Sequence, residues 1–204
     1  MNGNVGAGEL REIKIDATAP SFDLTCPAPA VRGSSAAATI SGAVDGLSGF
    51  VADPNGTFAL DTSVVGTHTH AAQIQDRAGN TTTKACTFSV VYGFGGIDQP
   101  VDPDGSSVFK LGSTVPLKFG ISDEGAASVT DAVATVTVAK VSNGVIGTEV
   151  EATSTVAATS GNTFRVTDGH YQFNLATKGL TTGTYRLTIT LTGGQQHTVT
   201  ISLR

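Results

Sequence analysis

The chain is a succession of short segments in which apolar and polar residues alternate, with turn-forming residues between nearly all of them. In residues 185–191, Tyr, Leu, Ile and Leu occupy one set of alternate positions, while Arg and Thr occupy the other. Successive side chains of a strand point to opposite faces, so this pattern predicts a half-buried antiparallel strand. The 25 Gly and the many Thr, Ser, Val and Ala residues are typical of short strands joined by tight turns, and no long helix is expected.

The alternation and the turn residues predict two series of strands, with the Gly-rich stretch at residues 93–96 as the boundary between them. Turns at Asp45-Gly46, at residues 53–56 and at residues 77–80 recur at the spacing of a β-sandwich. The first series is expected at residues 21–25, 37–44, 49–51, 57–61, 67–75 and 82–92. The second is expected at residues 108–111, 115–121, 132–141, 149–155, 164–167, 171–176, 184–191 and 197–203.

The first 16 residues resemble the end of the first series. A turn containing Asn4 precedes an alternating segment ending at Ile15, and Asn80 stands the same number of residues ahead of Val91. We interpret residues 1–16 as the last strand and linker of a truncated preceding repeat. The expected domains are therefore residues 17–92 and residues 93–204, and the last strand, ending at Arg204, is expected to be a natural C-terminus.

Charge and hydropathy exclude two classes of partner. The net charge is −5, and no stretch gathers Lys and Arg into a patch that would neutralise phosphates, so nucleic acid is not an expected partner. No window approaches the roughly 18 apolar residues of a membrane-spanning helix, and the first 20 residues lack the regions of a signal peptide.

Cys26 and Cys86 allow three interpretations: a disulfide, two free buried thiols, or half of a metal site. They lie in the first and last apolar segments of the first predicted domain, and such strands are commonly neighbours in a sandwich. We therefore predict a disulfide, which indicates an oxidising compartment and hence a secreted or cell-surface protein.

Two sets of motifs resemble known families. Residues 15–20 (IDATAP), Gly66-Thr67-His68-Thr69 and residues 76–81 (DRAGNT) are similar to the bacterial immunoglobulin-like repeats of large secreted and surface proteins. Residues 92–96 (YGFGG), residues 99–102 (QPVD) and residues 111–119 (LGSTVPLKF) resemble the Pro-x-Lys-Phe domain found at the end of secreted bacterial hydrolases and surface proteins.

The resemblance implies two tandem immunoglobulin-like antiparallel β-sandwiches, an all-β fold. It implies a non-catalytic structural, spacer or interaction module at the C-terminal end of a larger secreted or cell-surface bacterial protein. Its expected partners are neighbouring domains of the same polypeptide and a cell-surface glycan or protein. The alternative is a carbohydrate-binding or adhesive accessory module of an extracellular hydrolase, which would display exposed aromatic residues. The chain has no Trp, three Tyr and nine Phe, most of them at expected core positions.

No catalytic motif is present: the chain lacks a Gly-x-Ser-x-Gly elbow, a His-Glu-x-x-His helix and a phosphate-binding loop. No enzymatic activity and no required cofactor are expected. His68 and His70 share one face of a strand and would ligate zinc only with a third ligand; the simpler interpretation is a pair of strand histidines. Tyr185 is either a tyrosine whose hydroxyl bonds to nearby backbone or an ordinary core-edge tyrosine.

Acidic residues form the best candidate site. In an immunoglobulin-like sandwich the incoming linker, the loop after the second strand and the loop before the last strand share one end. Asp16, Asp45 and Asp76 lie in these three segments, with Asn80 close by, so three carboxylates are expected to converge as hard oxygen ligands for Ca²⁺. The alternative is that Asp45 and Asp76 only stabilise their turns.

A Lys–Asn isopeptide crosslink is the last hypothesis, with Lys14, Lys118 and Asn174 as candidates. Such a bond needs a buried Lys, Asn and carboxylate on adjacent strands. A structural salt link or a partly buried stem is a simpler use of Lys118.

Overall fold

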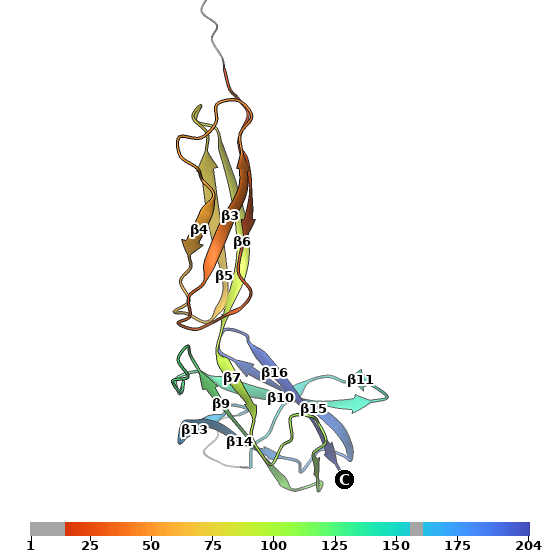
Figure 1. The fold of residues 1–204 in the computed structure, drawn as a ribbon. Coiled ribbons are helices and arrows are strands. Elements are labelled where there is room, and N and C mark those ends of the chain that lie inside the picture. The colour runs from red at the N-terminus through yellow and green to blue at the C-terminus, as the bar shows by residue number, and fades with distance from the viewer. Residues whose placement is uncertain (1–14, 156–160) are drawn as a thin grey trace, which may run out of the picture. The chain divides into compact units, whose positions relative to one another are not determined.

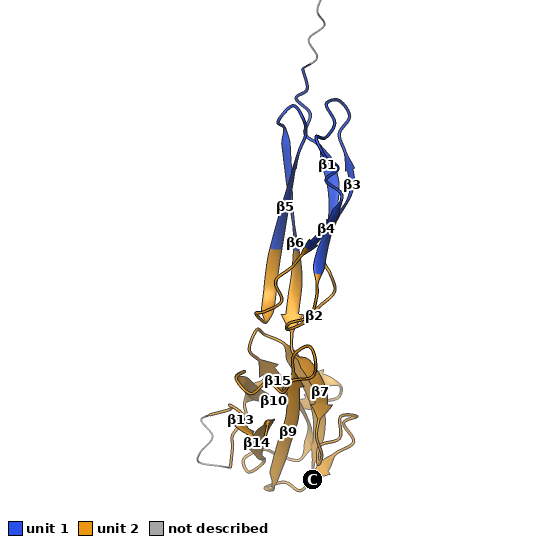
Figure 2. Cartoon of the chain, turned by 60° about the vertical axis from the view of Figure 1, so that its left-hand side comes forward, with its two compact units in different colours: residues 1–26, 37–58, 70–86 blue, residues 27–36, 59–69, 87–204 orange. Residues whose placement is uncertain are grey.

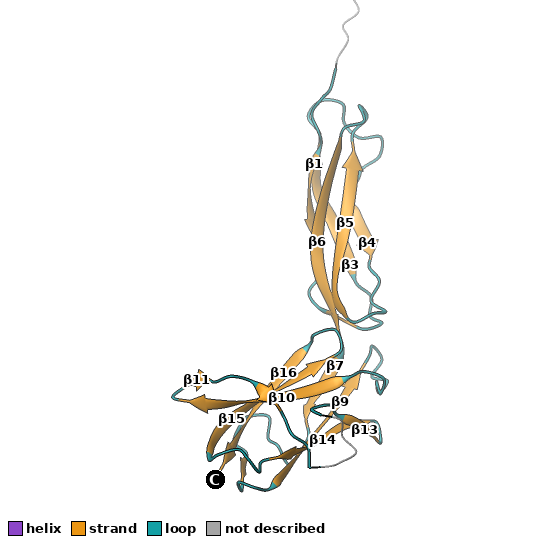
Figure 3. Cartoon of the chain, turned by 180° about the vertical axis from the view of Figure 1, so that it is seen from behind, coloured by secondary structure: helices purple, strands orange, loops and turns teal. Residues whose placement is uncertain are grey.

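The computed structural model describes residues 15–155 and 161–204, and these residues contain strands and loops but no helix (Figure 3). The predicted all-β class is confirmed. None of the described residues forms a helix long and apolar enough to cross a membrane. The strand predicted to end at Ile15 lies almost entirely outside the described residues.

The chain forms two compact units (Figure 2). Unit 1 consists of the residues up to 26, residues 37–58 and residues 70–86; unit 2 consists of residues 27–36, 59–69 and 87–204. Strands β5 (Gly66–Gln75) and β6 (Thr81–Val91) each supply residues to both units.

The first half of the chain contains two three-stranded sheets (Figure 1). One has the order β1-β3-β4 and the other β2-β6-β5; the remaining bounds are β1 Ser21–Thr25, β2 Ala30–Val31, β3 Ala37–Val44 and β4 Gly56–Ala59. The apolar cluster of unit 1 is small: its buried members are Phe22, Ile40 and Ile74.

The second half contains two larger sheets (Figure 1). In one, β11-β10-β15-β16-β8 lie side by side and β12 also pairs with β10; in the other the order is β13-β14-β9-β7. The bounds are β7 Gly93–Ile97, β8 Val108–Phe109, β9 Thr114–Ser122, β10 Ala134–Ser142, β11 Val145–Ile146, β12 Val150–Glu151, β13 Arg165–Thr167, β14 His170–Ala176, β15 Gly183–Leu191 and β16 Gln196–Leu203.

Period-two alternation builds the core of unit 2. In β9, Val115, Leu117, Phe119 and Ile121 are buried while the residues between them are only partly so. The inward residues of β10, β14, β15 and β16 complete one continuous cluster. Residues from both sheets bury a common apolar layer, which is the packing expected of a β-sandwich.

One expected strand does not form, and one strand was not expected. Residues 49–51 form no strand, because the backbone N–H of Gly49 donates to Oδ2 of Asp45 instead of to a neighbouring strand. The Gly-rich stretch at 93–96 is part of strand β7, which pairs with β9. A Cβ atom on Gly93 would lie 2.7 Å from Oγ of Ser122, so glycine here permits close approach of the two strands.

Tyr185 makes the backbone contact that its position suggested. Its hydroxyl accepts a hydrogen bond from the N–H of Thr181 at 3.0 Å and lies 3.1 Å from the carbonyl oxygen of the same residue, to which it donates. The ring is buried at the start of β15. Tyr185 therefore fixes the loop that precedes this strand.

His197 is expected to make the stability of unit 2 fall in mild acid. Its ring stacks on Phe94 at 3.6 Å, and burial lowers its pKa. The folded chain therefore binds a proton less readily than the unfolded chain. Stability is full above the unfolded pKa of about 6.5 and is lost as the pH falls through the folded pKa.

Urea denaturation of unit 2 between pH 8 and pH 5 measures this loss. His197→Gln should flatten the profile. Equal acid sensitivity of the wild-type chain and His197→Gln would show that another group is responsible.

Candidate functional site

The three predicted aspartates come together in unit 1. Asp16 precedes β1, Asp45 directly follows β3, and Asp76 directly follows β5. One carboxylate oxygen of each lies within 4.8 Å of the others. The ends of three segments, far apart in sequence, thus place three carboxylates around a common point.

Asp45 presents two different oxygens. Its Oδ2 atom accepts hydrogen bonds from the N–H groups of Leu47 and Gly49, at 3.2 and 2.6 Å, and from the hydroxyl of Ser48 at 3.3 Å. Its Oδ1 atom is buried and has no hydrogen-bond partner. Burying an ionised oxygen without a donor or a cation is costly, and Oδ1 is the oxygen of this carboxylate that has neither.

Asp76 is the most deeply buried of the three, with 4% of its surface exposed. Its two oxygens accept hydrogen bonds from the backbone N–H and the side-chain amide of Asn80, both at 2.8 Å. The same amide lies 3.3 Å from the carbonyl oxygens of Asp16 and Thr18. Asn80, predicted as a ligand, here supplies its amide nitrogen and positions Asp76 and the incoming chain.

Hydrogen bonds from Thr18 and Ser48 hold the carboxylate of Asp16. The N–H of Thr18 donates to Oδ1 at 2.9 Å, and the N–H of Ser48 donates to Oδ2 at 3.0 Å. These bonds, that of Thr18 foremost, lower the pKa of Asp16. Asp16 is therefore ionised at neutral pH.

The cluster concentrates negative charge without a cationic side chain. None of the ion pairs among residues 15–155 and 161–204 includes Asp16, Asp45 or Asp76. Carboxylates held this close repel one another unless a cation neutralises them. Hard carboxylate oxygens suit Ca²⁺, and the backbone donors leave the aspartates already oriented.

Ser48 is the functional residue that the sequence did not reveal. Its N–H binds Asp16 and its hydroxyl binds Asp45, so it joins the incoming chain to the loop after β3. A Ser in a Gly-rich turn has no distinguishing pattern, and its role depends on the approach of a segment 32 positions away.

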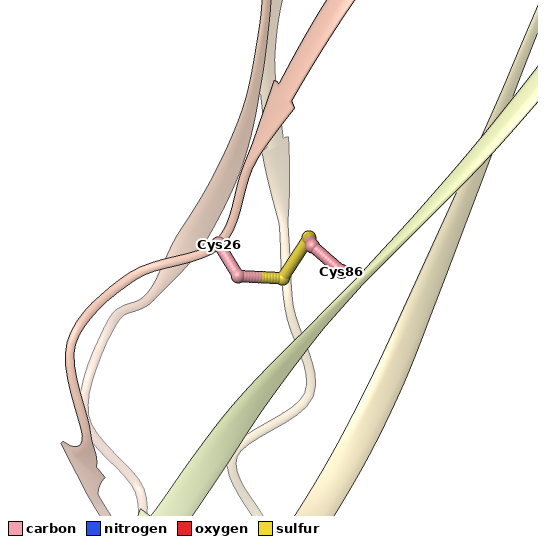
Figure 4. The surroundings of a disulfide bond; sticks show 2 residues. All are labelled: Cys26 and Cys86. Atoms are coloured by element: carbon pink, nitrogen blue, oxygen red, sulfur yellow. A yellow bond between two sulfur atoms is a disulfide. The ribbon is translucent and has the colours of Figure 1, made fainter.

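The predicted disulfide forms. Cys26 follows β1 and Cys86 lies within β6, with the two Cα atoms 5.7 Å apart (Figure 4). The two strands belong to different sheets, so the bond crosslinks β1-β3-β4 to β2-β6-β5.

The other candidates lack a complete site. His68 places Nε2 2.8 Å from the carbonyl oxygen of Val64 and stacks on Phe88, and neither His68 nor His70 belongs to a three-ligand cluster of the described residues. Lys118 and Asn174 are partly exposed on β9 and β14, outside the buried environment that a crosslink requires. Lys14 lies outside the described residues.

Comparisons with known proteins do not identify a family. No family model and no curated protein matches the chain. Among solved structures, a chimeric titin Z1Z2-Z1Z2 tandem is 18% identical, with 90% of this chain and 97% of that chain covered and a TM-score of 0.30.

Domains 4 and 5 of the S-layer protein SbsC are 18% identical over 71% of this chain and 68% of theirs, with a TM-score of 0.31. Extracellular domains 3–5 of Drosophila OTK are 14% identical over 91% of this chain and 61% of theirs, with a TM-score of 0.35. Similarity at this level assigns neither a family nor a function.

Proposed function

We propose that the chain is a non-catalytic spacer or interaction module of a larger secreted or cell-surface bacterial protein, with Ca²⁺ bound by Asp16, Asp45 and Asp76. The resemblance of its motifs to bacterial immunoglobulin-like repeats and to the Pro-x-Lys-Phe domain supports this role. The Cys26–Cys86 bond is consistent with an oxidising compartment outside the cell.

The aromatic side chains support a spacer over a sugar-binding module. Tyr92, Tyr171 and Tyr185 are buried, and Phe58 is the only Phe among the large exposed apolar side chains of the described residues. A sugar-stacking platform needs several exposed rings, so the aromatic residues serve mainly as core here.

The buried and unpaired Oδ1 atom of Asp45 is the observation that carries the calcium proposal. A cation bound at the cluster would give this oxygen a partner and neutralise the repulsion among the three carboxylates. Because Asp16 precedes β1 while Asp45 and Asp76 follow β3 and β5, the cation would fasten the entering chain to two loops. The expected consequence is a stiffer N-terminal end.

Calcium is expected to stabilise unit 1. At a free Ca²⁺ concentration about 100 times the dissociation constant, the free energy of unfolding should rise by ~2.7 kcal/mol. Isothermal titration calorimetry gives the dissociation constant, and calorimetric melts in CaCl₂ and in EGTA measure the gain. Superimposable melts would refute calcium binding.

Two variants sharpen this test. Asp45→Asn keeps the shape of the side chain and removes one charge, so it should abolish the calcium gain and raise the melting temperature in EGTA by relieving repulsion. Asp53→Asn is the matched control, because Asp53 only accepts hydrogen bonds from Asn55 in another loop of unit 1. Loss of the calcium gain in both variants would indicate a general charge effect.

A further inference from the structure

The Cys26–Cys86 bond encloses most of the first two sheets in a covalent loop. The two cysteines are 60 positions apart, and β2, β3, β4 and β5 lie entirely between them. Of the first six strands, only β1 and the last five residues of β6 lie outside the loop. Any tension that reaches Cys26 along the backbone has a direct covalent path to Cys86.

We infer that the disulfide shields residues 27–85 from mechanical load when the chain is pulled by its two ends. This inference rests on the proposed spacer role, in which a chain between two attachment points bears tension. Two paths lead from Cys26 to Cys86: the short disulfide, and the folded loop of 59 residues. The short path becomes taut first, so the backbone of the loop cannot be drawn out between the two cysteines.

In the first half of the chain, the unshielded part consists of the entering segment, β1 and the end of β6. Strand β1 is held by its antiparallel pairing with β3, in which Leu24 lies opposite Ile40, and by burial of Phe22. Residues 87–91 are held in part by parallel pairing of Val90 and Val91 with β2. We therefore expect tension to detach these short segments, and we expect the extension of this half of the chain to stop at the cysteines.

The acidic cluster spans the border between the loaded and the shielded chain. Asp45 and Asp76 lie inside the covalent loop, whereas Asp16 lies ahead of it. A cation shared by the three would anchor the loaded segment to the shielded loop before tension reaches β1. The disulfide limits how far the chain extends, and the cation would raise the force at which extension begins.

Single-molecule force spectroscopy on the full chain, held at its two ends, tests this inference. Fully extended chain spans roughly 3.3–3.6 Å per residue, so reduction should lengthen the fully extended molecule by about 200 Å. This total does not depend on whether the reduced protein still folds, because released residues add to the length either way. Residues 93–204 contain no cysteine, and the length that they release is the internal control.

Three outcomes would overturn shielding. Shielding is wrong if the oxidised chain releases the full length of residues 27–85, if reduction adds no length, or if the oxidised chain loses hydrogen-exchange protection in β3 and β5 at forces that detach β1. A repeat in EGTA separates this inference from the calcium proposal. An unchanged opening force would count against calcium at the cluster, while the short extension would still support shielding.

Discussion

Reduction of the Cys26–Cys86 bond is expected to lower the free energy of unfolding of unit 1 by about 4 kcal/mol. In the chain-entropy model a crosslink closing a loop of this length restricts the unfolded chain by that amount. The effect is large because, among the described residues, the buried apolar cluster of unit 1 contains only Phe22, Ile40 and Ile74. Small domains with so little core commonly depend on a covalent crosslink.

Thermal melts with and without a reductant measure this loss, and hydrogen exchange followed by peptide assigns it to β1, β3 and β5. The double variant Cys26→Ser, Cys86→Ser should match the reduced wild-type chain. Strands β9, β14 and β15 should keep their protection, because no cysteine lies in residues 87–204. A loss of less than about 1 kcal/mol would show that the small apolar cluster suffices on its own.

Strands with a clear period of two and defined turns were predictable from the sequence. The expected bounds of β1 and β3 agree with the structure, because Pro, Gly and Asp mark where these strands start and stop. Strands β9, β14, β15 and β16 were placed within one residue at each end. In these segments local propensity and burial favour the same conformation.

The missed strands depend on partners distant in the sequence. Strand β7 reads as a linker because two of its five residues are consecutive glycines, and only the approach of β9 reveals its pairing. Strands β2 and β11 are two residues long, which is too short for any periodic pattern. Tertiary contacts decide such segments, and they are absent from a single sequence.

The convergence of Asp16, Asp45 and Asp76 followed from topology, since all three flank strands that meet at one end. The individual hydrogen bonds of the cluster could not be predicted from the sequence. The side-chain amide of Asn80 points toward Asp76, and Oδ1 of Asp45 lacks a donor. Both features depend on side-chain orientations that are fixed only when the loops fold. Sequence patterns therefore predict which residues meet, but not which atom each presents.

Phe119→Ala is expected to lower the free energy of unfolding of unit 2 by about 3–5 kcal/mol. The side chain is fully buried on β9. Its ring stacks on Tyr171 at 5.1 Å and contacts the edge of Phe164 at 5.0 Å. Truncation removes this apolar burial and leaves a cavity among the surrounding aromatic rings. Because these rings are held in place by close packing, they cannot readily move to fill the cavity.

Urea denaturation monitored by Tyr fluorescence measures the loss, since Tyr92, Tyr171 and Tyr185 all lie in unit 2. Phe109→Ala is the matched control: this Phe lies on β8 of the same unit and is only partly buried, so its truncation should cost less. Hydrogen exchange in β1 and β3 should be unchanged in Phe119→Ala. A cost below about 1 kcal/mol, or equal costs for the two variants, would show that Phe119 is not a central member of the unit 2 core.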